Sequence, residues 1–382
     1  MTVRESRSAA EVTPFLVMEI LERAQELERA GVDIVHLEVG EPDFDCPPCV
    51  QAAAQAAISA GRTHYTHSLG TLALREEIAR YYDRRYGVVV SPARIVVTTG
   101  SSGGLTLLMA LLLEAGDEIL LPDPGYACYP NFVRAFHGVP VFFPLDRSAG
   151  FRYDIGTVRR AATVRTRAVM VNSPANPTAA IQSRETLAAL AGLGIPVISD
   201  EIYHGLEYGE PAATLLAITD SGFVLDGFSK RYAMTGWRIG WLVAPEPLVP
   251  VLQCLQQNLF ICAGSVAQEA ALAALRAGDE AVEAMRQEYD RRRGSLLAGL
   301  RALGFGLPVE PAGAYYVLAD ARHLDADSRR LAHRLLEEAH VGVAPGVDFG
   351  ALAEGHLRFS FASAPGRIEL GMGRLSEWLL RQ

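Results

Sequence analysis

The stretch GFVLDGFSKRYAMTGWRIGW, residues 222–241, decides the fold, because it shows the pattern that repeats through the chain. A short apolar run between glycine and aspartate is typical of a buried β-strand. Lys230 follows this run and is the only lysine among 35 lysine and arginine residues. An arginine stays charged in proteins, whereas a lysine can lose its proton and attack a carbonyl. We therefore expect a reactive amine at a strand end, although chance alone can leave one lysine in an arginine-rich chain.

Six further short apolar runs share the pattern, and each is predicted to be a buried strand. They are ARIVVTTG (93–100), DEILLP (117–122), VPVFFPL (139–145), RAVMVNSP (167–174), IPVISDE (195–201) and RIGWLVA (238–244). Helical patterns such as 103–115 and 184–193 lie between them. This alternation predicts an α/β protein with a mostly parallel sheet that has helices on its faces.

The chain changes character near residue 280. Residues 279–303 form one long, charged amphipathic pattern, which favours a helix that connects two domains. The strand candidates AYYVLAD (314–320) and HLRFSFA (356–362) follow in a smaller α+β segment. A helix over 14–30 is expected to pack beside that segment. We expect an N-terminal segment at 1–46, a large domain at 47–280 and a small domain at 281–382.

Composition narrows the range of partners. A net charge of -9 and a pI near 5.6 give no basic surface for nucleic acid or an anionic membrane, which favours small molecules. The longest apolar helical run, around Leu107 to Leu113, is shorter than the roughly 20 residues of a membrane span. The start MTVRESRSAAEV lacks an apolar signal core, so a cytoplasmic location is expected.

The five cysteines do not suggest a disulfide framework, and we expect them to be reduced. Cys46 and Cys49 have the spacing of a redox or zinc half-site, but no second Cys/His pair stands near them. A loop that enters a helix is the simpler interpretation. The nine histidines show no metal-binding spacing, and no metal is expected.

Polar residues follow the predicted strands, at the edge where open α/β sheets bind their ligands. Gly100-Ser101-Ser102-Gly103-Gly104 opens an apolar helix and offers N–H groups and two hydroxyls to an anion such as phosphate. Such turns also occur for steric reasons alone. Tyr126 follows the next strand, where its ring can stack on a planar ligand or simply pack in the core.

Three more strand ends supply further functional groups. Asn176, Asp200 and Tyr203 provide an amide, a carboxylate and a phenol, although short polar residues at strand ends also cap turns. Lys230 stands at the next strand end. Arg238, eight residues beyond it, can pair with a phosphate in a bidentate way. A phosphate site, an aromatic ring, a carboxylate and an amine together predict a site for pyridoxal phosphate.

Eight motifs stand in a specific order along nearly the whole chain. They are LEVGEPDFD (37–45), HYTHSLGTLALREEIARYY (64–82), TTGSSGGL (98–105), NSPANPT (172–178), SDEIYHGLEY (199–208), GFSKRYAMTGWRIGW (227–241), PAGAYYVLAD (311–320) and LRFSFA (357–362). In this order they resemble the class I/II aminotransferases, the fold-type-I enzymes that depend on pyridoxal phosphate. One motif alone is moderate evidence, but their joint order is highly specific.

The resemblance implies a role for each strand-end residue. Lys230 is expected to bind the cofactor covalently and to move the proton at the substrate Cα. Asp200 is expected to pair with the pyridine nitrogen of the cofactor. Asn176 and Tyr203 are expected to hydrogen-bond its phenolic oxygen, and Tyr126 to stack on its ring. Lys230, Asp200 and Tyr203 are therefore the expected catalytic residues.

The resemblance also implies binding sites for the phosphate and the substrate. The expected phosphate ligands are Ser101, Ser102, Gly103, Ser229 and Arg238. Tyr65 is expected to reach the cofactor phosphate of a neighbouring subunit, which implies a homodimer with shared active sites. Arg358 is expected to hold the substrate α-carboxylate as a planar fork, beside Asn176 and the Gly40 backbone, unless it is an exposed strand residue. Closure of the small domain over the substrate is expected.

Departures from the family pattern bear on the turn and on the substrate. Ala179 stands where the family has glycine after Asn-Pro-Thr, so a slightly different turn is expected. The pocket segment Pro14 to Val17 is largely apolar, and Ser102 stands where aspartate-specific relatives can have lysine. No obvious cation awaits a side-chain carboxylate. We expect an apolar, aromatic or thioether L-amino acid as donor, and 2-oxoglutarate or pyruvate as acceptor.

Other functions remain open on the sequence. A lyase that eliminates at Cβ or Cγ, such as a C–S β-lyase, needs the same carbanion and differs mainly in how it positions the leaving group. An aspartate aminotransferase would need a cation from elsewhere in the fold. A non-catalytic sensor of pyridoxal phosphate would carry an added DNA-binding domain, for which the aminotransferase pattern leaves no room.

Overall fold

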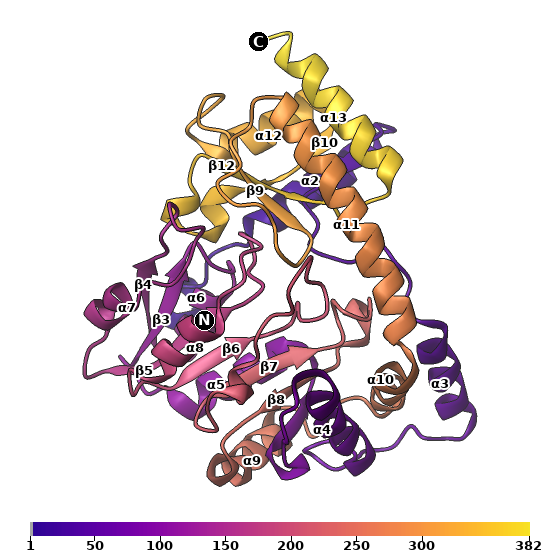
Figure 1. The fold of residues 1–382 in the computed structure, drawn as a ribbon, viewed down its shortest axis with the longest axis vertical. Coiled ribbons are helices and arrows are strands. Elements are labelled where there is room, and N and C mark those ends of the chain that lie inside the picture. Colours follow the sequence, from indigo (N-terminus) through magenta and orange to yellow (C-terminus); the bar gives the residue numbers. More distant parts are fainter. Residues whose placement is uncertain (1–2) are drawn as a thin grey trace.

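The structure, a computed structural model that describes residues 3–382, contains three β-sheets. The largest has seven strands in the order β2-β8-β7-β6-β5-β3-β4. A three-stranded sheet, β11-β12-β9, and the pair β1-β10 lie in the upper part of Figure 1. The strands are β1 Val35–His36, β2 Ile95–Thr98, β3 Glu118–Asp123, β4 Val139–Pro144, β5 Thr166–Asn172, β6 Val197–Asp200, β7 Phe223–Gly227, β8 Gly240–Val243, β9 Tyr316–Asp320, β10 Val341–Gly342, β11 Ala344–Pro345 and β12 His356–Ser360.

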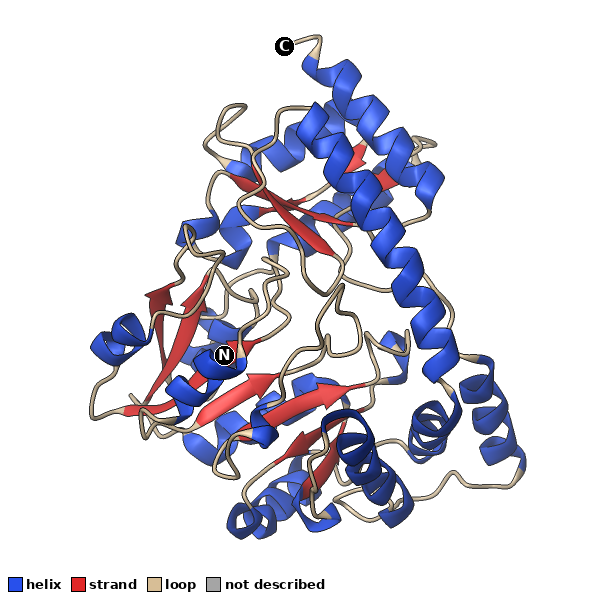
Figure 2. Cartoon of the chain, viewed as in Figure 1, coloured by secondary structure: helices blue, strands red, loops and turns tan. Residues whose placement is uncertain are grey.

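Helices surround these sheets, as Figure 2 shows. The α-helices are α1 Arg7–Ala10, α2 Leu16–Arg29, α3 Pro48–Ser59, α4 Leu72–Tyr86, α5 Gly100–Leu112, α6 Tyr129–Ala135, α7 Ile155–Ala161, α8 Arg184–Ala191, α9 Val249–Leu259, α10 Ser265–Ala277, α11 Asp279–Ala302, α12 Ser328–Ala339 and α13 Pro365–Leu379. The short 3-10 helices are η1 Pro92–Arg94, η2 Leu215–Ala217, η3 Thr235–Trp237, η4 Glu246–Leu248, η5 Gly346–Phe349 and η6 Ala351–Ala353.

All seven predicted runs form strands of the large sheet, and the predicted fold class is confirmed. The sheet is mostly parallel, but β8 is antiparallel to both of its neighbours, β2 and β7. One prediction was wrong, because β4 is not a buried strand. Val139 and Phe142 on β4 are 42% and 46% exposed, since this edge strand has a partner, β3, on one side only.

Alternate residues of the central strands enter different hydrophobic clusters, one on each face of the sheet. On β2, Val97 belongs to one cluster and Val96 to the other, and on β7 the same holds for Val224 and Leu225. Helices α3, α4, α8 and α10 supply side chains to the first cluster, and α5, α6 and α9 to the second. Burial on both faces explains why these strands are continuously apolar in sequence.

A third hydrophobic cluster combines the N-terminal and C-terminal parts of the chain. It contains residues of α2 and β1 together with residues of α11, β9, α12, β12 and α13. Helix α11 runs from α10 to the side of α13 as one continuous element of 24 residues, close to the predicted range (Figure 1). This grouping supports the division at 1–46, 47–280 and 281–382, which we retain as a proposal. Helix α2 bridges two clusters, since Val17 packs in the first and Ile20 in the third.

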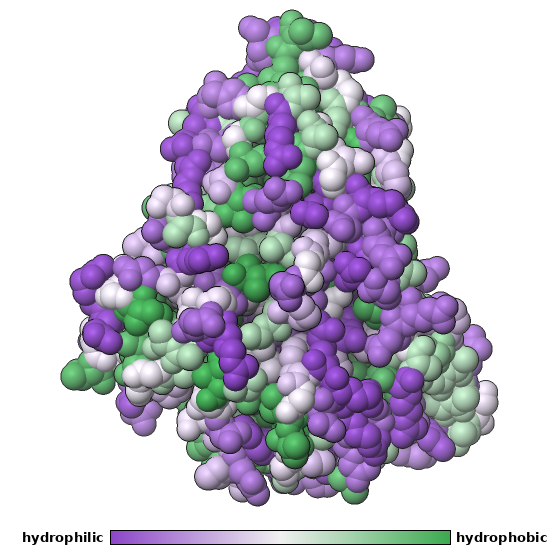
Figure 3. Space-filling view, in the orientation of Figure 1, coloured by the Kyte–Doolittle hydropathy of each residue, from purple (hydrophilic) through white to green (hydrophobic). Residues whose placement is uncertain are grey.

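The surface is mixed in character. Figure 3 shows hydrophilic side chains over much of the visible face, with smaller apolar patches between them. Within residues 3–382, no helix is long and apolar enough to cross a membrane. The same residues hold no group of three or more His, Cys, Asp or Glu side chains arranged to bind a metal ion.

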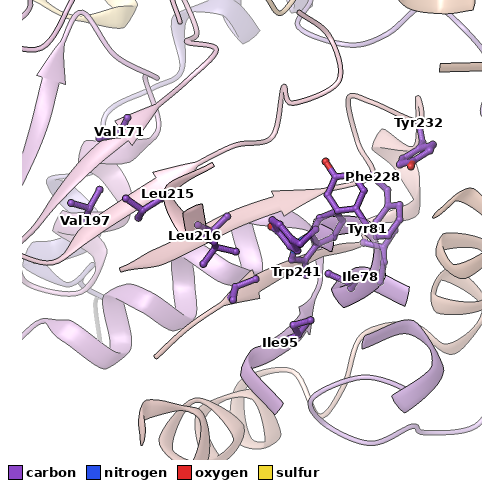
Figure 4. Close-up of a cluster of buried hydrophobic side chains, with 14 of the residues drawn as sticks. Ile78, Tyr81, Ile95, Val171, Val197, Leu215, Leu216, Phe228, Tyr232 and Trp241 are labelled. Atoms are coloured by element: carbon purple, nitrogen blue, oxygen red, sulfur yellow. The ribbon is translucent and has the colours of Figure 1, made fainter. Parts of the chain in front are cut away.

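Phe228 is a central residue of the first cluster and lies two positions before the lysine. Its ring is fully buried against Trp241 and Tyr232, at centroid distances of 5.1 and 5.7 Å (Figure 4). We expect Phe228→Ala to lower the free energy of unfolding by about 3–5 kcal/mol, because it removes a buried ring and leaves a cavity. Urea denaturation measures this loss. Phe228→Leu, the control, should cost clearly less, and a loss under about 1 kcal/mol for the alanine variant would contradict the expected packing.

Candidate active site

A cavity of about 390 Å³ lies where the carboxyl ends of β5, β6 and β7 face the small-domain strand β12. Most of the predicted site residues line it: Gly40, Ser101, Ser102, Tyr126, Asn176, Asp200, Tyr203, Ser229, Lys230, Arg238 and Arg358. Two predicted residues do not line it in this chain. Gly103 is buried within α5, and Tyr65 is 80% exposed on the segment that joins α3 and α4.

Lys230 lies in the turn that follows β7. Its Nζ donates a hydrogen bond to the Gly40 carbonyl at 2.7 Å. Burial lowers the pKa of Lys230 from 10.5 to about 8, although the charge of Glu41 acts in the opposite direction. A larger fraction of neutral amine, the form that can attack a carbonyl, is therefore present near neutral pH than for an exposed lysine.

Asp200 ends β6 and is 5% exposed. Its Oδ2 accepts a hydrogen bond from the Tyr129 hydroxyl at 2.6 Å, and its Oδ1 accepts one from the Ile202 N–H at 3.2 Å. Burial raises the pKa of Asp200 to about 6, and the Tyr129 hydrogen bond limits that rise. The group is therefore mainly a carboxylate at pH 7 and can hold a cationic N–H.

Asn172 connects the ends of neighbouring strands, a role that sequence reasoning missed. Its Nδ2 donates to the Asp200 carbonyl at 3.0 Å, and its Oδ1 accepts from the Asn176 N–H at 2.7 Å. Asn172 thus fixes the Asn176 loop against β6. In that loop Ala179 has φ 56°, a left-handed conformation that favours glycine, so alanine occupies the turn at some cost in strain.

The N-terminus of α5 forms an anion site in outline. The helix begins at Gly100, three residues before the predicted start, and Ser101 and Ser102 stand in its first turn. Gly100 has φ 74°, and a Cβ atom there would lie 2.9 Å from Nη2 of Arg238. The Arg238 guanidinium therefore approaches the helix N-terminus, where N–H groups and a fixed cation together can hold a phosphate.

Two tyrosines that line the cavity share a hydrogen bond. The hydroxyls of Tyr203 and Tyr316 are 2.9 Å apart, and burial raises the pKa of Tyr203 well above its usual value, so the phenol stays protonated. Tyr316 on β9 was not among the predicted site residues. The ring of Tyr126 makes edge contacts with Phe15 and Tyr129, at centroid distances of 6.2 and 5.2 Å.

Arg358 is 1% exposed, so the alternative of an exposed strand arginine is wrong. Its Nη1 donates to Asn176 Oδ1 at 3.0 Å, and its Nη2 donates to the Glu38 carbonyl at 2.5 Å. The guanidinium lies over the rings of Tyr316 and Phe349, at 4.4 and 4.8 Å from their centroids. Its Nε has no hydrogen-bond partner in the described part of the chain. A carboxylate can therefore still gain donors from this group.

One wall of the cavity is apolar, and sequence reasoning identified only part of it. The residues of that wall are Phe15, Val17, Met18, Leu21, Val39, Leu105 and Ile202. Phe15 and Val17 lie in the segment that the family resemblance indicated. Met18 and Leu21 belong to the first turns of α2 and were not predicted. Leu21 lies four residues after Val17, and this helical spacing could have placed both on the same side of the helix. Glu41 and Thr235 add a polar hydrogen-bonded pair at the cavity edge.

The chain matches the family described as aminotransferase class I and II over residues 32–370, and it belongs to that family. It is similar to the aspartate/prephenate aminotransferase of Thermus thermophilus, with 39% identity over 98% of this chain and 99% of the relative. It is similar to the valine–pyruvate aminotransferase of Mycobacterium tuberculosis, with 38% identity over 98% of each chain. A crystal structure of an aminotransferase from Mycobacterium tuberculosis superimposes with a TM-score of 0.95, at 37% identity and full coverage of both chains.

These similarities confirm the predicted family, fold class and enzyme class: the chain is an aminotransferase. The named substrates of the two relatives differ, since one name contains aspartate and prephenate and the other valine and pyruvate. Membership of the family therefore does not define the amino donor or the oxo-acid acceptor, which depend on the residues that line the cavity.

Proposed function

We propose that this aminotransferase uses pyridoxal phosphate to move the amino group of an apolar, aromatic or thioether L-amino acid to a 2-oxo acid such as 2-oxoglutarate or pyruvate. The observation that carries the proposal is the common cavity of Lys230, Asp200 and Arg358, with the α5 N-terminus beside it. An amine, a buried carboxylate, a carboxylate-binding cation and an anion site are the groups that this chemistry requires.

The residues around the cavity fit that cofactor. Asp200 keeps an anionic oxygen for a protonated ring nitrogen, and Ser101, Ser102, Ser229 and Arg238 surround the helix N-terminus that suits a phosphate. Gly240 packs against that turn so closely that a Cβ atom would lie 3.1 Å from the Ser101 nitrogen. When bound, pyridoxal phosphate supplies an electron sink for the carbanion at the substrate Cα.

Each residue then has a distinct task. The Arg358 guanidinium binds the substrate α-carboxylate, and Asn176 and Gly40 lie beside it. The Lys230 amine takes the proton from Cα and later returns one, because it is the neutral base with the lowered pKa. Tyr203, protonated at neutral pH, donates its hydrogen bond to the cofactor oxygen.

The charges around the cavity support the donor class. Its cations in the described chain are Lys230, Arg238 and Arg358, and each is already assigned to the cofactor or the α-carboxylate. Glu41 adds a carboxylate at the edge. A second carboxylate on the donor would therefore find repulsion and no counter-charge, whereas an apolar side chain can pack on the α2 residues of the lining. The same repulsion acts on the second carboxylate of 2-oxoglutarate, so of the two acceptors the charges favour pyruvate.

We also propose a homodimer with shared sites, in which Tyr65 reaches the phosphate of the partner's cofactor. Its 80% exposure in the single chain supports a role outside its own cavity. Light scattering of the purified protein at several concentrations measures the mass, and a monomer at micromolar concentration would overturn this part of the proposal.

A donor panel tests the main proposal. The purified protein, loaded with pyridoxal phosphate, is given leucine, phenylalanine, methionine or aspartate with each of the two acceptors. We expect kcat/KM for the best of the first three to exceed that for aspartate by about tenfold or more. A preference for aspartate would overturn the donor class. S-methylcysteine, which carries sulfur on Cβ, is added to the panel, and release of methanethiol, pyruvate and ammonia from it without any acceptor would indicate the C–S lyase instead.

The lowered pKa of Lys230 gives a pH prediction for covalent attachment of the cofactor. Only the neutral amine attacks, so the rate at which cofactor-free protein captures pyridoxal phosphate should rise with pH and reach half of its maximum near pH 8. Borohydride reduction followed by peptide mass analysis measures the modified Lys230 peptide. A midpoint near the 10.5 of an ordinary lysine would contradict the burial argument. Lys230→Ala serves as the blank.

A further inference from the structure

Residues 34–40 connect the small domain to the cavity, and their backbone is held on two sides. The Leu37 N–H donates to the Gly342 carbonyl at 3.0 Å, and the Leu37 carbonyl accepts from the Ser360 N–H at 2.7 Å. The segment therefore lies between β10 and the end of β12, and its position is coupled to both strands.

Two carbonyls of this segment hold the two cations of the cavity that face the substrate. The Glu38 carbonyl accepts from Arg358, and the Gly40 carbonyl accepts from Lys230. Since Nη2 of Arg358 is directed at the Glu38 oxygen, that peptide group sets the plane of the guanidinium together with Asn176 and the rings of Tyr316 and Phe349.

The Glu38 side chain is buried beneath this peptide and is not used in the reaction described above. Its exposure is 0%, and its Oε1 lies 2.6 Å from Nδ1 of His36. The other oxygen, Oε2, has no hydrogen-bond partner within residues 3–382 and packs on Gly342, where an added Cβ atom would overlap the carboxylate. A buried carboxylate is costly unless a cation and hydrogen bonds compensate it, so His36 is essential to its burial.

His36 supplies that compensation as a cation. The hydrogen bond that His36 donates to Glu38 raises the pKa of His36 to about 9, so the imidazole is protonated at neutral pH. Its second nitrogen lies 3.1 Å from Oε1 of Glu28, an exposed residue near the end of α2. A series of contacts therefore connects Glu28 at the surface with His36, His36 with the Glu38 side chain, and the Glu38 carbonyl with Arg358.

We propose that the half-buried His36 and the buried Glu38 form a positioning pair for substrate binding: the pair fixes the Glu38 carbonyl that orients the Arg358 guanidinium towards the substrate carboxylate. This inference rests on the proposed role of Arg358. Both the amino acid and the oxo acid bring a carboxylate to the same guanidinium, so the pair governs the affinity for both substrates and leaves the proton transfer at Lys230 unchanged.

Substitution of Glu38 tests the proposal through the division between KM and kcat. In Glu38→Ala we expect KM to rise about tenfold for the donor and for the oxo acid alike, with kcat within about twofold of the wild type. Glu38→Gln keeps the shape and one acceptor for His36, and should recover most of the affinity. Glu28→Gln, the matched control, removes only the outer partner of His36 and should leave both KM values unchanged.

A substitution at a neighbouring residue can displace the Glu38 side chain while Glu38 itself is kept. Gly342→Ala pushes on the Glu38 carboxylate, and we expect it to raise both KM values as well. Circular dichroism melts identify any variant that fails to fold, and Gly342→Ala keeps the test decisive if Glu38→Ala does so. Unchanged KM values in folded Glu38→Ala or Gly342→Ala, or a loss confined to kcat, would overturn the proposal.

Binding of 3-phenylpropionate, a carboxylate that cannot react, gives a readout besides turnover. Its dissociation constant, followed by protein fluorescence in the cofactor-loaded protein, should increase about tenfold in Glu38→Ala and remain unchanged in Glu28→Gln. If the wild type binds this probe through Glu38 and Arg358 but transaminates no amino acid, the positioning role stands and the proposed function fails. If the wild type transaminates and the dissociation constant of the probe is unchanged in Glu38→Ala, the positioning role fails and the proposed function stands.

Discussion

Replacement of Lys230 by alanine is expected to abolish transamination, with a fall in rate of about 10⁴-fold or more. The reason is that this amine both anchors the cofactor and moves the proton at Cα in the proposed reaction. The cavity offers no other amine in residues 3–382, since its remaining cations are the guanidinium groups of Arg238 and Arg358. Single-turnover conversion of the best donor, followed by absorbance, measures the effect.

Lys230→Arg is the matched control for this experiment. It keeps a positive charge in place but cannot lose its proton, so it should be as inactive as the alanine variant. Both variants are expected to fold, because within residues 3–382 the lysine Nζ makes a single hydrogen bond, to the Gly40 carbonyl. Retention of more than about 1% of the wild-type rate by either variant would contradict the role of the free amine.

The second large effect is expected for Asp200→Asn, with a fall in kcat of about 10³-fold. An amide has nearly the same shape but no charge, so it cannot hold a cationic ring nitrogen at the end of β6. The kinetic constants at saturating cofactor measure the loss, and the dissociation constant of the cofactor gives an independent readout.

Tyr129→Phe separates the charge of Asp200 from its hydrogen bond. This variant removes the hydroxyl that donates to Oδ2 at 2.6 Å but keeps the carboxylate. It should therefore lose at most about 100-fold in kcat, the scale of one hydrogen bond to a charged group. A similar loss in both variants would show that the hydroxyl, and not the charge, carries the effect.

The large sheet could be predicted because its strands are buried on both faces and are therefore apolar without interruption. The edge strand β4 has the same apolar composition, so the exposure of Val139 and Phe142 could not be predicted. Strands β1, β10 and β11 have two residues each, too few for any periodicity. The start of α5 at Gly100 was placed three residues late, since glycine and serine are weak helix formers.

Within the site, the residues at strand ends could be predicted from their type and order. Tyr129 begins α6, Tyr316 begins β9 and Asn172 ends β5, and none of the three was predicted, because nothing in their type or spacing separates them from ordinary core or capping residues. They reach the cavity only through packing between distant elements. Glu38 could not be predicted for the same reason. Its carboxylate contacts His36 and its carbonyl contacts Arg358, and no spacing in the sequence indicates the second of these contacts.

Helix α11 is long enough to turn a small rotation at its first residue into a large displacement of the small domain. At about 1.5 Å per residue, its 24 residues form a rod of roughly 36 Å, and a tilt of about 5° at the base would carry the far end through about 3 Å. The helix begins at Asp279, whose carboxylate is 2.9 Å from the guanidinium of Arg231. Arg231 is the residue next to Lys230. We propose that a slight rotation at the base of α11, beside the residue next to Lys230, closes the domain that carries Arg358 over the substrate.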